Sequence, residues 1–123
     1  MIDKLLEYLG IRKSLIGYWV IKDIMARILS DEQNLTRIGE LYLEIAQDMG
    51  TSCSAVEKNV RTAVQSCWNK KRKELCKLAK CELTKAPSNT MFFEILTAYI
   101  MWSEKKKKAH NDPVTSRTNS VEQ

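Results

Sequence analysis

Glycine and proline are scarce in this chain, with four glycines and two prolines among 123 residues. Both residue types interrupt regular structure, so their scarcity predicts long helices joined by short loops. No run of alternating β-branched and polar residues indicates a sheet. We therefore expect an all-α protein, and a chain of this length forms one domain around a single hydrophobic core.

Long apolar runs are missing too, since none approaches the ~20 residues that span a membrane. The N-terminal sequence MIDKLLEYLG is amphipathic and contains no signal-peptide core or cleavage site. We therefore expect a cytoplasmic protein that has no membrane partner.

Metal ligands and catalytic motifs are also lacking. The one histidine is His110, and the cysteines, at positions 53, 67, 76 and 81, form no C-x-x-C pair. This spacing predicts no metal site and no cofactor, and it favours reduced cysteines that pack in the core. The chain has no phosphate loop, no His–Cys or His–Asp constellation and no H-E-x-x-H helix, so we expect no enzymatic activity.

Charge is distributed unevenly along the chain. Residues 1–50 carry six basic and eight acidic side chains, residues 51–82 carry eight and three, and residues 83–123 carry six and four. The positive middle segment is typical either of a surface that faces a polyanion or of a solvated helix face.

Helical periodicity predicts six helices, at residues 2–9, 17–29, 36–49, 53–69, about 75–79 and about 91–102. Gly10 and Gly50 are expected to end helices, while Thr36 and either Ser88 or Asn89 are expected to begin them.

The apolar faces are expected to include Trp19, Leu29 and Met49, and all three tryptophans are expected to pack in the core or at its rim. One of Phe92 and Phe93 is expected to be buried and the other partly exposed. Residues 1–104 are predicted to form the domain, and the polar residues 105–123 a disordered tail.

The most informative segment is LYLEIAQDMGTSCSAVEKNVRTAVQSCW, residues 41–68, which predicts two helices joined by a tight turn. Thr51, Ser52 and Ser54 are candidate N-caps of the second helix. Its predicted inner residues are Val56, Val60, Ala63, Val64 and Cys67, and its predicted outer residues are Ala55, Lys58, Asn59, Arg61, Thr62 and Gln65. Such an outer face can enter a major groove as part of a helix-turn-helix, although any helical hairpin of a small bundle has the same periodicity.

The segments GIRKSLIGYWVIKDI, LYLEIAQDMGTSCSAVEKNVRTAVQSCW and KAPSNTMFFEIL follow one another between about residues 2 and 102. Together they resemble the C-terminal DNA-binding effector domain of the sporulation stage-zero master response regulator of spore-forming Firmicutes. The resemblance implies a six-helix orthogonal bundle containing a helix-turn-helix whose second helix reads an operator box. It also implies binding to tandem boxes as a homodimer and contact with RNA polymerase sigma factor.

The resemblance places the family's base-reading positions at Ala55, Glu57 and Lys58, where the family typically has Arg, Glu and Arg. Its backbone-contacting positions fall on Ser54, Arg61 and Thr62, where the family has Ser, Arg and His. Since alanine cannot form the bidentate contact that arginine makes with guanine, the operator is expected to be altered or more weakly discriminated. The basic run at residues 70–73, longer than in the family, can offset lost contacts through phosphate binding.

The family protein usually carries an N-terminal phosphoacceptor receiver domain, whereas this chain begins close to the first helix of the effector domain. It is expected to be a stand-alone regulator or an excised domain. A stand-alone protein would not be gated by phosphorylation in the usual way.

Two functions follow from these observations. The leading one is a sequence-specific transcription regulator that binds double-stranded DNA, and the alternative is a protein-interaction module of the same fold. Such a module would pair with a full-length regulator or sigma factor without reading bases; Ala55 favours it, and the basic segment at residues 51–82 favours DNA binding. The candidate DNA-binding residues are Ser52, Ser54, Ala55, Glu57, Lys58, Asn59, Arg61, Thr62, Lys70, Lys71 and Arg72.

Overall fold

Five α-helices and one short 3-10 helix account for nearly all of the regular structure in the computed structural model, which describes residues 1–111. The elements are α1 (Ile2–Tyr8), α2 (Ile16–Ser30), η1 (Glu32–Arg37), α3 (Ile38–Met49), α4 (Cys53–Ala79) and α5 (Asn89–Asn111). No strand occurs in this part of the chain, so the all-α prediction is confirmed. The count of six α-helices is not reproduced, for a reason that lies in α4.

Helix α4 continues through the basic run that we expected to separate two helices. Lys71 is its one residue with non-helical dihedral angles, φ −132° and ψ 40°, and it marks a kink. Two helical stretches meet at this kink, which falls inside the basic run where we expected one helix to end and the next to follow. The expected short helix at about 75–79 is therefore the last part of α4.

The start of α3 also differs from the prediction. Residues 32–37 form η1, whose N-cap Asp31 accepts a hydrogen bond from the backbone N–H of Gln33 at 3.0 Å. Thr36 does not cap α3, because its hydroxyl donates to the carbonyl oxygen of Gln33 at 2.7 Å. The chain thus makes a tight 3-10 turn before α3 begins.

Helix α5 begins where the capping pattern predicts and ends later. The backbone N–H of Met91 donates to the Ser88 hydroxyl at 3.1 Å, which confirms Ser88 as the cap. The helix runs to Asn111, beyond the expected end at Trp102 and into the first residues of the expected tail. Lysine favours the helical state, and adding residues to a helix that has already nucleated is easier than starting a new one. Residues 112–123 of the predicted tail lie outside the described chain.

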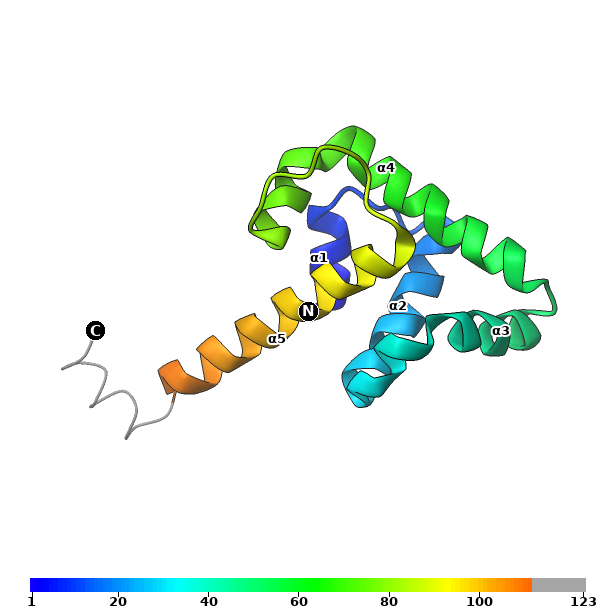
Figure 1. Cartoon of the computed structure of the whole chain (residues 1–123), viewed down its shortest axis with the longest axis horizontal. Coiled ribbons are helices and arrows are strands. Elements are labelled where there is room, and N and C mark those ends of the chain that lie inside the picture. The colour runs from blue at the N-terminus through cyan, green and yellow to red at the C-terminus, as the bar shows by residue number, and fades with distance from the viewer. Residues whose placement is uncertain (112–123) are drawn as a thin grey trace.

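Figure 1 shows α4 lying across α2 and above α3, while the far end of α5 extends away from the other helices. Tyr18, Ile21, Ile24 and Met25 of α2 are almost completely buried in the core that these helices enclose. Phe92 and Phe93 are both fully buried and meet edge to face, with ring centroids 6.3 Å apart. The expectation that one of these two phenylalanines is exposed is therefore wrong.

Three apolar side chains that we assigned to the helix faces turned toward the core are exposed. Trp19, Leu29 and Met49 retain 52%, 39% and 47% of their accessible surface. In α2, Tyr18 occupies the core position, so the neighbouring Trp19 points outward and its indole N–H donates to the Lys13 carbonyl oxygen at 2.8 Å. Trp68 is buried, whereas Trp102, like Trp19, is exposed, so the expectation that all three tryptophans pack in the core or at its rim is wrong for these two.

The four cysteines are free, and they occupy different environments. Cys67 is buried, Cys53 and Cys76 are half-buried, and Cys81 is exposed, so the prediction that all four pack in the core is wrong for Cys81. None of the helices within residues 1–111 is long and apolar enough to cross a membrane.

Candidate nucleic-acid interface

A three-residue turn joins α3 to α4, and local hydrogen bonds fix both of its ends. Gly50 adopts the left-handed conformation at φ 68°, and the N–H groups of Gly50 and Thr51 donate to the carbonyl oxygens of Gln47 and Ala46. This is the Schellman arrangement that ends a helix at glycine. Ser52 then caps α4, because its hydroxyl accepts a hydrogen bond from the Ala55 N–H at 3.1 Å. Both capping predictions are confirmed.

The inner face of the first half of α4 packs as the periodicity predicts. All five residues expected there are buried: Val56, Val60, Ala63, Val64 and Cys67. They pack into the core together with Leu41, Ile45 and Ala46 of α3. Because this side of α4 is fixed to the core, the opposite side is turned to solvent along its length.

The outer face of α4 brings together most of the candidate DNA-binding residues. Ser54, Glu57, Lys58, Arg61 and Thr62 are all exposed on consecutive turns. Polar side chains extend this face toward the C-terminus, where the Gln65 amide donates to the Asn69 side-chain oxygen at 3.0 Å. The result is a solvent-facing polar surface about four turns long.

Two candidate residues are less accessible than the outer face. Ala55, in the first turn of α4, and Asn59 are half-buried. The start of α2 lies against this flank, since a Cβ added to Gly17 would approach the carbonyl carbon of Asn59 to 3.0 Å. Asn59 therefore faces a neighbouring helix as much as it faces solvent.

Positive charge on α4 is almost uncompensated within the described residues. Arg61 is the one basic residue of the helix that forms an ion pair there, with Glu57 at 3.8 Å, and both side chains are largely exposed. An exposed pair of this kind contributes about 0–1 kcal/mol. Arg61 and Lys58 are consequently available to an external anion.

Arg27 and Arg37, which lie before α4 in the chain, are in contrast neutralised by neighbouring carboxylates. Arg27 bonds Asp23 and Glu44, each at 2.8 Å, and Arg37 bonds Glu40 at 2.5 Å and Glu44 at 3.1 Å. The hydrogen bond to Asp23 raises the pKa of Arg27. The uneven charge of the sequence thus becomes an ion-paired surface on α2 and α3 and a basic surface on α4.

The remaining candidates lie further along α4, at the kink. Lys70 and Arg72 are exposed, and the Arg72 guanidinium lies 4.3 Å above the centroid of the Trp68 ring. Lys71 is half-buried, and its aliphatic chain packs against Gly10. Since a helix rises about 1.5 Å per residue, Lys70 lies about 18 Å from Lys58, and the three residues form a second basic group.

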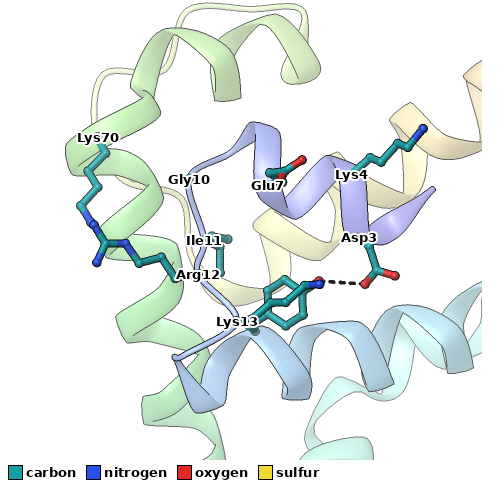
Figure 2. A pocket seen from close by; sticks show the side chains of 9 residues that line it. Asp3, Lys4, Glu7, Gly10, Ile11, Arg12, Lys13 and Lys70 are labelled. Carbon is teal, nitrogen blue, oxygen red and sulfur yellow. Dashed lines mark hydrogen bonds between the residues drawn. The ribbon is translucent and has the colours of Figure 1, made fainter.

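Sequence reasoning missed the contribution of the segment between α1 and α2. Arg12 and Lys13 of this segment line a surface pocket of about 600 Å³ together with Lys70 (Figure 2). At the other side of the pocket, Asp3 accepts hydrogen bonds from the Tyr18 hydroxyl at 2.8 Å and the Lys22 ammonium at 3.2 Å. These bonds lower the pKa of Asp3, while burial raises the pKa of Tyr18. The pair of adjacent basic residues at positions 12 and 13 is the sequence feature that could have indicated this contribution.

Residues 1–111 contain no group of three histidine, cysteine or acidic side chains that is arranged to hold a metal ion. A search of curated proteins found no match to the chain. The family model described as "Sporulation initiation factor Spo0A C terminal" matches residues 2–100. The chain therefore belongs to the family of Spo0A C-terminal domains, the DNA-binding effector domains of sporulation response regulators.

Proposed function

We propose that this protein is a sequence-specific DNA-binding transcription regulator in which α3 and the first half of α4 act as a helix-turn-helix. The observation that carries the proposal is the exposed outer face of α4, with Lys58 and Arg61 following a capped three-residue turn. A helix presented in this way fits a major groove, and its cations attract the phosphates at the groove edges.

Within this proposal the candidate residues divide into two groups. Glu57 and Lys58 face base edges, where a carboxylate accepts from the cytosine amino group and an ammonium donates to guanine O6 and N7. Ser54, Arg61 and Thr62 contact the phosphate backbone, which sets the position of the helix without reading sequence. Ser52 caps the first turn of α4. Asn59 is half-buried beside the outer face of α4, where its backbone packs against α2.

The operator of this protein is proposed to differ from the family's box. Ala55 lies at a base-reading position of the resemblance, and its methyl group offers only an apolar contact, such as that with the thymine methyl. The basic group at residues 70–72 offsets the lost contact through sequence-independent attraction to phosphates. Pairing on tandem sites, contact with sigma factor, a cytoplasmic location and a stand-alone arrangement remain predictions.

A protein-interaction module of the same fold is the second candidate. It is favoured by the absence of an arginine at position 55 and by the exposed apolar side chains of Leu43 and Met49 on α3, which retain 51% and 47% of their surface. Such a module would use α3 to meet a full-length regulator or sigma factor.

A titration at two salt concentrations separates the two candidates. The protein is added to a labelled duplex carrying the family box and to a scrambled duplex of equal length and composition. A transcription regulator of the proposed kind binds both duplexes with a steep salt dependence and prefers the duplex that carries the family box. Absence of binding to either duplex at low salt would overturn the proposal in favour of the protein-interaction module.

A further inference from the structure

Two cationic side chains from distant parts of the sequence converge beside α4. Arg12 lies in the segment between α1 and α2, Lys70 lies immediately before the kink of α4, and both are exposed. They line the same pocket, and Figure 2 shows the Arg12 side chain reaching across α4 toward Lys70. Within the described chain neither of them forms an ion pair with a carboxylate.

The fold holds Arg12 in this place. Its neighbour Ile11 is 2% exposed and donates its N–H to the Leu6 carbonyl oxygen at 2.9 Å, while the Arg12 carbonyl oxygen accepts from the Leu15 N–H at 3.1 Å. Gly10, at φ 73°, lies on the aliphatic chain of Lys71, which fixes the segment to the kink of α4. The backbone position of Arg12 relative to Lys70 is therefore determined by buried contacts.

The acidic residues of the same pocket do not compensate these two charges. Asp3 is engaged by Tyr18 and Lys22, and Figure 2 shows Glu7 directed away from Arg12. Two cations that the backbone holds near each other repel, and an anion placed between them relieves this repulsion. The planar fork of a guanidinium together with the point charge of an ammonium suits a phosphate group.

We propose that Arg12 and Lys70 bind a phosphate of the DNA backbone outside the operator box, an inference that rests on the proposed function. Lys70 follows Lys58 by twelve residues, which corresponds to about 18 Å along a helix. The contact adds affinity without sequence information.

The test uses Arg12→Gln and Lys70→Gln, with Lys4→Gln as a matched control. Lys4 is an exposed cation that lines the same pocket, but Figure 2 shows it pointing away from α4. Affinity is measured at several salt concentrations on a long duplex with the box at its centre. Each of the first two variants lowers the slope of log affinity against log salt by up to about 0.9, the value for one phosphate, on the box and on scrambled DNA alike, whereas the control does not.

Duplex truncation locates the contact. Two further duplexes end flush with the box on one side and extend beyond it on the other. Arg12→Gln no longer changes the salt slope on the duplex that lacks the flank carrying the contacted phosphate. On the duplex that keeps this flank, the change in slope persists. Thermal unfolding of the variants matches that of the unmodified protein, because both side chains are exposed.

Two results would overturn the inference, and they differ in what they imply for the proposed function. If Arg61→Ala lowers the salt slope while Arg12→Gln and Lys70→Gln leave it unchanged, the helix binds DNA and the second phosphate contact is absent. If the unmodified protein binds no duplex, both the contact and the proposed function are wrong.

Discussion

Gly17 of α2 lies directly against the backbone of Asn59 in α4, with no space for a side chain between them. A Cβ at position 17 would approach the carbonyl carbon of Asn59 to 3.0 Å and the Cβ of Ala63 to 2.9 Å, and would overlap the Asn59 carbonyl oxygen. The flank of the proposed recognition helix is thus supported by a helix–helix contact that only glycine permits.

The first prediction concerns this contact. Gly17→Ala is expected to lower the free energy of unfolding by about 1–3 kcal/mol, because backbone atoms that cannot rotate away must shift. Gly39→Ala is the matched control, since a Cβ at that helical position meets nothing within 4 Å. The control should not lower stability, because alanine is favoured over glycine at helical positions. Urea denaturation measures both changes, and equal stability of the two variants would contradict the close approach of α2 and α4.

The second prediction concerns Arg61. Arg61→Ala is expected to weaken binding to every duplex and to lower the salt slope by about 0.9, because one phosphate contact is lost. The fold should be unaffected, since the exposed pair with Glu57 contributes little. Salt titrations on box and scrambled duplexes measure the effect, with Lys4→Ala as a charge-matched control. An unchanged slope would show that this face of α4 does not lie on DNA.

The third prediction concerns specificity at Ala55. Ala55→Arg is expected to sharpen the preference for the family box by about 1–3 kcal/mol at one base pair, because a bidentate contact with guanine becomes possible. The residue is half-buried in the first turn of α4, so the change should cost no more than about 1 kcal/mol of stability, including the unfavourable placement of a cation at a helix N-terminus.

Competition between the box and single-base variants measures that preference. Ala26→Arg adds the same charge at an exposed position of α2 and serves as the control. It should leave the preference for the box unchanged. Equal discrimination by the two arginine variants would contradict a base-reading role for position 55.

The fourth prediction concerns the cysteines. Burial raises the pKa of the Cys67 thiol to about 12, so this thiol stays protonated and shielded at mildly alkaline pH. Cys81 is exposed and should be alkylated first by iodoacetamide. Mass spectrometry of timed samples gives the order of modification, and denaturant should make both sites reactive. Rapid modification of Cys67 in the folded protein would contradict its burial.

The fifth prediction concerns pH. Hydrogen bonds from Tyr18 and Lys22 lower the pKa of Asp3 below its ordinary value of 3.8. The ionised Asp3 carboxylate therefore stabilises the folded protein at pH values above 3.8. This contribution is lost as the pH falls through the lower pKa that Asp3 has in the folded state. Asp3→Asn should be less stable than the unmodified protein at neutral pH, and the difference should shrink in acid. Denaturant unfolding over a pH series measures this, and a difference that is constant in acid would contradict the assigned bonds.

Local signals in the sequence were enough to predict the joint between α3 and α4. Gly50 and Ser52 make their hydrogen bonds with residues a few positions away, so their roles depend on nearby sequence alone. The buried stripe of α4 repeats at the helical period and was predicted for the same reason. The contacts between the outer face of α4 and DNA remain predictions, and the titrations above test them.

Tertiary contacts decided what the local pattern left open. Tyr18 rather than Trp19 enters the core, because the position of α2 on α4 selects one of two adjacent aromatic residues. Arg12 lines the same pocket as Lys70, and Gly17 lies against Asn59, only after α2 packs against α4. Helical periodicity determines which side of a helix is apolar, but the distance and rotation between two helices depend on contacts between residues far apart in the chain. For that reason the helices could be predicted from the sequence, whereas the basic pocket beside α4 required the folded structure.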